Sequence, residues 1–224
     1  MKIIARIRTA FPEKFGIPRQ SGLLPELEAR IVFEPEFRVP EALRGIEGYS
    51  YLWLIWEFSE AVRDTWSPTV RPPRLGGNTR VGVFATRSPF RPNPIGLSSV
   101  RLLRIEKTTQ EGTVLIVSGA DLLDGTPIYD IKPYLPYTDS HPDAESGFAG
   151  DLLGNRLHAQ IPETELCKIP AELRNSLTEL LENDPRPSYQ SDPEREYGLK
   201  FSGFEVRFKV ADEILSVLEI TEKP

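Results

Sequence analysis

Short apolar runs separated by proline and glycine fill the first half of this chain and restrict what it can fold into. These runs have the length and composition of β-strands, and few stretches show the spacing of an amphipathic helix. Many strands of similar length favour a closed or nearly closed β architecture. The runs cover residues 3–8, 29–33, 49–58, 81–84, 97–105 and 113–118.

The run 49–58 is aromatic and nearly continuous, which predicts a strand that is buried on both faces. We interpret its rings as core residues rather than as a surface on which a cofactor stacks. Residues 39–43 are expected to form one short helical turn.

The composition changes near residue 138. Residues 138–160 are rich in small and polar types and predict a solvated linker. Beyond the linker, leucines gather on one face of an amphipathic helix at 170–181. Apolar and charged residues alternate at 204–210, which predicts a half-buried strand paired in a hairpin with 215–220. These elements predict a small α+β C-terminal domain.

The composition, 39% hydrophobic and 27% charged, is that of a globular protein. No apolar run reaches the length of about 18 residues that a membrane-spanning helix needs, and the first residues do not resemble a secretory signal. Cys167 is the only cysteine, and its separation from His141 and His158 argues against a zinc site. We therefore expect a cytoplasmic protein without a metal and without membrane association.

The net charge of −6 argues against a general nucleic-acid binder, but the charges are unevenly distributed. Residues 61–104 hold eight arginines, no lysine and one acidic residue, Asp64, so this segment carries +7 and the rest of the chain −13. Such a basic segment fits a site-specific contact with RNA. It also fits arginines that pair with acidic residues of other segments.

The segment 82–96, which reads GVFATRSPFRPNPIG, lies between two strand-like runs. Its prolines restrict the backbone, so less entropy is lost when the loop is ordered. Arg87 and Arg91 offer donor-only groups that suit a phosphate or a carboxylate. From the residues alone, a ligand-binding loop and a structural turn are equally good interpretations.

The same segment resembles the signature of the TsaA-like family, also called YaeB or TrmO. Every fixed position of the signature is met, and further motifs follow in the family's order over most of the chain, including the tail. The signature residues are Gly82, Val83, Phe84, Arg87, Ser88, Arg91, Pro92, Asn93, Ile95 and Gly96. The other matching stretches are 18–20, 66–78, 121–127 and 130–134.

The resemblance implies an S-adenosylmethionine-dependent methyltransferase that acts on tRNA. The acceptor would be N6 of threonylcarbamoyladenosine, the modified adenosine next to the anticodon. The family fold is a β-barrel, and its members form homodimers. The absence of a G-x-G-x-x-G stretch agrees with a fold outside the doubly wound methyltransferase class. The expected fold is therefore mainly β, with a single TsaA-like β-barrel at 1–140, a linker at 141–161 and a small α+β C-terminal domain at 162–224.

The resemblance also places the cofactor contacts. They are Pro18, Arg19, Gln20, Ser59, Glu60, Arg87, Leu97, Asp121, Leu122, Leu123 and Asp124. Relatives carry His-Gln where this chain has Ser59-Glu60, so any role of that histidine ring is missing here. Arg87 or Arg19 would suit the carboxylate of S-adenosylmethionine, and Gln20 and the aspartates its adenine and ribose.

We expect direct in-line methyl transfer, in which positioning contributes much of the rate enhancement. A general base would help only if it reached the N6–H of the acceptor, and Asp121, Asp124 and Tyr134 are the candidates. RNA contacts are expected mainly on the barrel, at Arg71, Arg74, Arg80, Arg91, Asn93 and Lys132. Two alternatives stay open: a non-catalytic module that binds RNA or S-adenosylmethionine, and a methyltransferase with a different acceptor.

Overall fold

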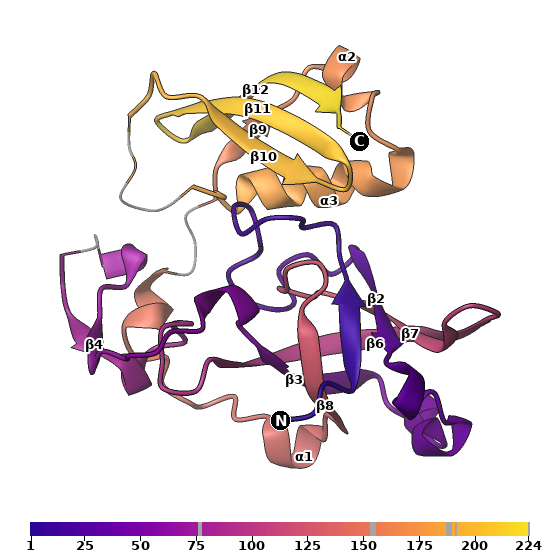
Figure 1. Cartoon of the computed structure of the whole chain (residues 1–224). Coiled ribbons are helices and arrows are strands. Elements are labelled where there is room, and N and C mark those ends of the chain that lie inside the picture. Colours follow the sequence, from indigo (N-terminus) through magenta and orange to yellow (C-terminus); the bar gives the residue numbers. More distant parts are fainter. Residues whose placement is uncertain (76–77, 153–155, 187–189, 191, 224) are drawn as a thin grey trace.

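The computed structural model describes residues 1–75, 78–152, 156–186, 190 and 192–223, without the side chains of Arg74, Asp151 and Leu152. The chain forms two stacked parts, a six-stranded sheet with its connections and a smaller C-terminal sheet with a helix (Figure 1). Within the described residues, no helix has the length and apolarity that a bilayer crossing needs. The structure confirms the prediction of a mainly β chain with a small α+β part at its C-terminus.

Each strand of the larger sheet pairs with two neighbours, so the sheet closes into a barrel. β8 completes the ring by pairing with β1, where Ala5 lies opposite Ile128. Inward-pointing side chains such as Ile7, Ile31 and Leu54 are fully buried. In spatial order the strands are β1 (Ala5–Arg8), β2 (Glu28–Phe33), β7 (Gly112–Ser118), β6 (Ile95–Thr108), β3 (Tyr51–Glu57) and β8 (Pro127–Pro133).

Two local predictions about the barrel were wrong. The side chains of β3 are alternately buried and partly exposed, with Leu52, Leu54 and Trp56 inside. In a barrel one face of each strand points outward, so an aromatic run does not need two buried faces. The expected strand at 81–84 is a strand only at β5 (Val81–Gly82), and the chain then turns into the 3-10 helix η6 (Val83–Ala85).

The C-terminal sheet has the order β10-β11-β12-β9 and is accompanied by two helices. Helix α3 follows Pro170 and confirms the predicted amphipathic helix. β11 and β12 form the predicted hairpin, and the turn between them places Asp212 at a φ of 55°. β9 comes from residues expected to be linker and pairs in parallel with β12. The elements are β9 (His158–Gln160), α2 (Glu163–Leu166), α3 (Ala171–Glu182), β10 (Tyr197–Phe201), β11 (Phe204–Ala211) and β12 (Ile214–Glu222).

The remaining elements are short and lie in the connections. The helical turn expected at 39–43 is present as η2. The elements are η1 (Pro35–Phe37), η2 (Pro40–Leu43), η3 (Ile46–Gly48), η4 (Ser59–Ala61), β4 (Thr69–Val70), η5 (Pro73–Leu75), α1 (Pro136–Asp139) and η7 (Gly147–Leu152).

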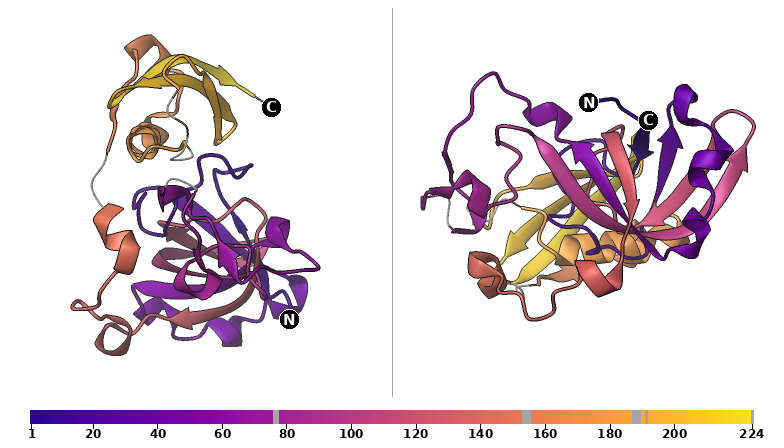
Figure 2. Two further views of the ribbon diagram at one scale, coloured as in Figure 1. Left: turned by 90° about the vertical axis from the view of Figure 1, so that its left-hand side faces the viewer. Right: turned by 90° about the horizontal axis from the view of Figure 1, so that it is seen from below.

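Three connections meet at one end of the barrel. They join β1 to β2 (residues 9–27), β3 to β6 (58–94) and β7 to β8 (119–126). We call them connections A, B and C. Connection A lies between the barrel and the C-terminal part, which is stacked on this end of the barrel (Figures 1 and 2).

The hydrophobic core is divided in the same way. One buried cluster fills the barrel, and a second lies between α3 and the C-terminal sheet. Phe11, Leu24 and Leu27 of connection A belong to the second cluster, although they are far from it in sequence. The C-terminal core is therefore completed by residues from the N-terminal part of the chain.

Candidate functional site

Three residues expected to contact the cofactor converge at this end of the barrel, one from each connection. Arg87 Nη1 donates a hydrogen bond to Gln20 Oε1 at 2.5 Å, which joins connection B to connection A. The positive charge of Arg87 also lies close enough to the Asp121 carboxylate to lower its pKa. These residues form a single group, the Gln20–Arg87–Asp121 cluster.

Asp121 is the member of the cluster that reaches into the barrel. Its Oδ1 accepts from Ser98 Oγ at 2.5 Å, and Ser98 Oγ accepts from Trp56 Nε1 at 2.9 Å. Burial has the largest effect and raises the pKa of Asp121 above its usual value, although the Ser98 hydroxyl and Arg87 oppose that rise. A carboxylate with a raised pKa is a stronger base. Asp121 is the carboxylate of the cluster and therefore its candidate proton acceptor.

Gly96 of the signature segment is required by the packing of Trp56. It lies opposite Trp56 in the β3–β6 pair, and a Cβ at this position would collide with the indole ring. The absence of a side chain lets the ring lie over β6 with its N–H bonded to Ser98. This signature residue therefore supports the cluster from within the core.

The segment that holds Asp124 is bonded both internally and to Thr9 at the end of β1. Asp124 Oδ1 accepts from the backbone N–H of Thr9 at 2.9 Å. The carbonyl oxygens of Leu122 and Leu123 accept from the hydroxyls of Thr9 and Thr126, at 3.0 and 2.7 Å. These bonds fix connection C against the end of β1.

Arg19 and Pro18 lie beside the cluster on connection A. Pro18 is half-buried, and Arg19 is exposed. The Arg19 guanidinium donates to the carbonyl oxygens of Asp184 and Arg186, at 3.1 and 2.7 Å. Arg19 is thus turned toward the C-terminal part, and Arg87 is the arginine whose positive charge acts on Asp121.

Ser59 and Glu60 are exposed at the beginning of connection B. Lys14 of connection A donates to the backbone oxygen of Glu60 and pairs with its carboxylate, both at 3.2 Å. Leu97, at the start of β6, is 54% exposed and presents an apolar surface at the same end of the barrel.

The side chains of Arg91 and Asn93 have different surroundings within the signature segment. Arg91 Nη1 donates to the carbonyl oxygen of Thr86 at 3.0 Å and so supports the shape of its own loop. The Asn93 side chain is exposed. Of the two, Asn93 is the more accessible to a ligand.

Tyr134 and Lys132 lie toward the other end of the barrel. The β3–β8 register places Lys132 beside Trp53, near the beginning of β3, whereas Trp56 is near its end. The Tyr134 ring packs against Trp53, with 5.5 Å between ring centroids. The structure therefore does not bring Tyr134 or Lys132 together with Asp121.

The arginines of the basic segment fall into two groups. Arg71 and Arg80 are exposed on connection B. Arg104 forms an ion pair with Glu28 at 2.6 Å. This agrees with the alternative that arginines of this segment pair with acidic residues of other segments. The side chain of Arg74 lies outside the described residues.

Trp56, Ser98 and Thr9 hold the aspartates in place, and none of them was predicted from the sequence as a site residue. The signal for Ser98 was the alternation of β6, because Ser98 falls on the same inward face as Gly96 and Val100. A serine inside a barrel needs a polar partner, and a buried partner points to a site.

The comparison with known protein families identifies the chain. The model of the tRNA-methyltransferase O N-terminal domain matches residues 6–140, and the model of the TrmO C-terminal domain matches residues 155–223. The chain belongs to the tRNA-methyltransferase O family. The family resemblance inferred from the sequence is thereby confirmed.

Individual proteins similar to this chain cover either nearly all of it or about two thirds of it. The tRNA (adenine(37)-N6)-methyltransferase of Escherichia coli (strain K12) is 40% identical over 217 residues, which are 93% of this chain and 92% of that protein. A Pyrococcus abyssi protein named as a probable S-adenosyl-L-methionine-binding protein is 37% identical over 145 residues, 65% of this chain and 73% of its own. The crystal structure of TrmO from P. aeruginosa has a TM-score of 0.78 at 34% identity and covers 98% of this chain and 94% of that one.

Proposed function

We propose that this chain is an S-adenosylmethionine-dependent tRNA (adenine(37)-N6)-methyltransferase that methylates N6 of threonylcarbamoyladenosine. The Gln20–Arg87–Asp121 cluster is the observation that carries the proposal. It brings together cofactor positions of the family from three separate connections, through a hydrogen bond from Arg87 to Gln20 and the electrostatic effect of Arg87 on Asp121.

The groups in the cluster fit S-adenosylmethionine. The exposed Arg87 guanidinium suits a carboxylate, because its planar fork can donate two parallel hydrogen bonds. Gln20 and the backbone of 121–124 supply polar groups for adenine and ribose, and Leu97 supplies an apolar contact. When bound, S-adenosylmethionine supplies an electrophilic methyl group. Among the described residues, no group of three or more His, Cys, Asp and Glu side chains is placed to hold a metal ion.

In the proposed reaction, the protein positions the reacting groups and supplies a general base. We assign to Asp121 the acceptance of the N6 proton, since burial raises its pKa and Ser98 fixes its orientation. Asp124 is already bonded to the backbone of Thr9, so we assign it a positioning role. Arg71 and Arg80 are proposed to contact tRNA phosphates, because both are exposed on connection B, which also carries Arg87.

We further propose a homodimer formed through connection B. Apolar side chains are unusually exposed along this segment: Val62 by 59%, Trp66 by 53% and Phe84 by 73%. Trp66 and Phe84 are neighbours, with 6.2 Å between their ring centroids. Exposed apolar groups that lie together favour an interface, and sedimentation velocity measures whether the chain is a dimer.

The domain organisation and location are part of the same proposal. Residues 1–140 form the methyltransferase domain, and the C-terminal domain begins with β9 at residues 158–160 rather than at residue 162. A cytoplasmic location fits a tRNA substrate and the single, exposed Cys167.

The test uses the purified chain, S-adenosylmethionine with a labelled methyl group, and two preparations of the same tRNA. One preparation carries threonylcarbamoyladenosine and the other unmodified adenosine. We expect label only in the modified tRNA, and mass spectrometry of the digested product should place one methyl group on the modified nucleoside.

Other outcomes separate the alternatives. Cofactor binding without transfer to either tRNA would indicate a non-catalytic binding module. Label in the unmodified tRNA would indicate a methyltransferase with a different acceptor. Either result would contradict the proposed function.

A further inference from the structure

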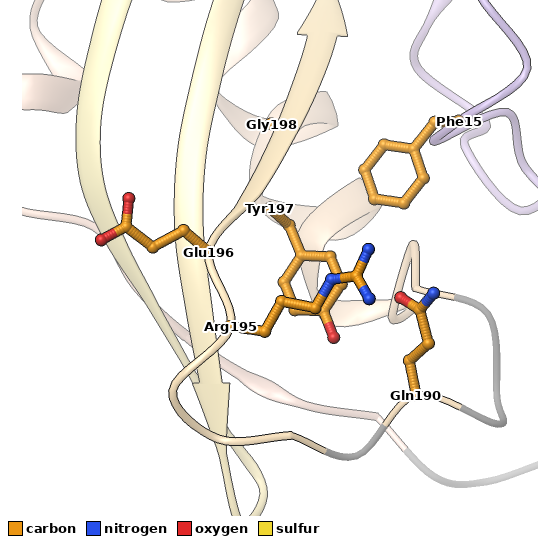
Figure 3. Close-up of a pocket in the computed structure, with 6 residues that line it drawn as sticks. All are labelled: Phe15, Gln190, Arg195, Glu196, Tyr197 and Gly198. Atoms are coloured by element: carbon orange, nitrogen blue, oxygen red, sulfur yellow. The ribbon is translucent and has the colours of Figure 1, made fainter.

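Connection A is packed into the C-terminal part on one of its sides. Phe11 and Leu24 are each 1% exposed, and both belong to the C-terminal core. Figure 3 shows Phe15 beside Tyr197 of β10; their ring planes are within 6° and their centroids 6.4 Å apart. Large apolar side chains of this connection are therefore held by a part of the chain that lies far away in sequence.

Polar contacts support the same packing. The backbone N–H of Ser202 donates to the carbonyl oxygen of Ala10 at 2.9 Å. Lys200 pairs with Glu13 at 2.8 Å. Together with the bonds from Arg19 to the residues after α3, these contacts join connection A to the C-terminal part at several points.

The other side of connection A contacts the candidate site. Gln20 accepts from Arg87, and the backbone N–H of Gly22 donates to Gly119 at 2.8 Å. The backbone N–H of Asp124 donates to the carbonyl oxygen of Phe11, also at 2.8 Å. Phe11 thus links the two sides directly, because its ring is in the C-terminal core and its carbonyl holds connection C.

One glycine fixes how closely connection A approaches the C-terminal sheet. Gly16 has a φ of 90°, and a Cβ at this position would collide with the Leu199 side chain alone. Leu199 is fully buried in β10. A methyl group at position 16 would therefore have to displace the buried Leu199 side chain or push connection A and β10 apart.

We propose that the C-terminal part is a positioning element of the cofactor site, acting through the contact of Gly16 with Leu199 on connection A. This inference rests on the proposed cofactor site. It assigns to the C-terminal part a control over cofactor affinity that is independent of any contact with tRNA. Gly16 and Leu199 are positioning residues, since neither belongs to the Gln20–Arg87–Asp121 cluster.

The test compares two glycines with the same backbone conformation. Gly16→Ala introduces both strain and the collision with Leu199, whereas Gly45→Ala introduces the strain alone, because Gly45 also has a φ of 90° and no atom lies near its missing Cβ. Isothermal calorimetry of the full-length variants measures the Kd for S-adenosylmethionine. Gel-shift titration without cofactor measures the Kd for tRNA, and circular dichroism checks that each variant is folded at the assay temperature.

We expect Gly16→Ala to weaken cofactor binding by about tenfold relative to Gly45→Ala, while the Kd for tRNA is unchanged. The double variant Gly16→Ala with Leu199→Ala provides the second test. It removes the side chain that the new methyl group meets, so its cofactor affinity should be higher than that of Gly16→Ala. Hydrogen exchange at the Gly22 amide should follow the same order.

Equal cofactor affinities for Gly16→Ala and Gly45→Ala would overturn this inference and leave the proposed function intact. Failure of the double variant to recover affinity would also overturn it. Absence of cofactor binding by the wild-type chain would overturn the proposed function, and with it the inference.

Discussion

Connections A and B face the same candidate site but are built in opposite ways. Connection A places Phe11, Leu24 and Leu27 in a core and is bonded to both parts of the molecule. Connection B is longer, and its aromatic side chains Trp66 and Phe84 are exposed. Many of its hydrogen bonds stay within the connection itself, as with the bond from Arg91 to Thr86.

The difference shows which parts of the site a single chain can preorganise. Connection A is fixed by burial, so Gln20 is held before any ligand arrives. Connection B carries Arg87 and the exposed aromatic surface, and we expect its conformation to change when that surface is covered.

Replacement of an aromatic ring by alanine should change the free energy of unfolding much more in connection A than in connection B. Phe11→Ala should lower the free energy of unfolding by about 3–5 kcal/mol, because it leaves a cavity in the C-terminal core. Phe84→Ala should change it by less than about 0.5 kcal/mol, since that ring is exposed. Urea denaturation measures both, and similar losses in the two variants would contradict the contrast.

Arg87 links the two connections and should be the side chain most important for the cofactor. Arg87→Ala should weaken S-adenosylmethionine binding by about 1.5–3 kcal/mol, the usual effect of losing a hydrogen bond to a charged group. Arg87→Lys keeps the charge but loses the planar fork, so it should restore only part of the affinity. Calorimetry that finds wild-type affinity in the alanine variant would reassign Arg87 to RNA or to structure.

Two glycines of the signature segment should differ in their tolerance of a methyl group. Gly96→Ala should destabilise the chain by about 1–3 kcal/mol, because the added Cβ collides with Trp56. At Gly82 nothing lies close to the missing Cβ, and its φ of −58° is accessible to alanine. Thermal denaturation with equal losses in both variants would show that Trp56 adjusts without strain.

The smallest effect concerns the exposed arginines of connection B. Removal of Arg71 and Arg80 together should reduce the salt dependence of tRNA affinity by about one slope unit for each phosphate that is no longer bound. Arg104→Ala is the matched control, since Arg104 is paired with Glu28 and should leave the slope unchanged. Titration at several salt concentrations tests this, and equal slopes in all variants would exclude the RNA role.

Much of the barrel followed from the sequence, because apolar runs bounded by proline and glycine mark strands directly. The strand β8 was not predicted, since Pro127–Pro133 carries proline at both ends and polar residues between them. The placement of Phe11 in the C-terminal core also could not be predicted. Its partners lie near the other end of the chain, and local pattern carries no information about such distant contacts.

The candidate site shows the same limit. The signature motif located Arg87, and a second family motif located Asp121, but their junction with Gln20 depends on how three connections meet in space. Trp56 and Ser98 act on Asp121 through a hydrogen-bonded chain that no linear motif contains. The sequence therefore predicted which residues belong to the site. It did not predict which residues of neighbouring strands hold them in place.

Hydrogen exchange with and without S-adenosylmethionine distinguishes a connection that is fixed before the cofactor binds from one that becomes ordered around it. We expect connection A to be the fixed one and connection B to become ordered. The amide of Gly22 in connection A should be protected before the cofactor is added and should change little. The amides of Val83 and Thr86 in connection B should gain protection strongly on binding. Protection gained first at Gly22, or none gained at Val83 and Thr86 when the cofactor is bound, would contradict the account.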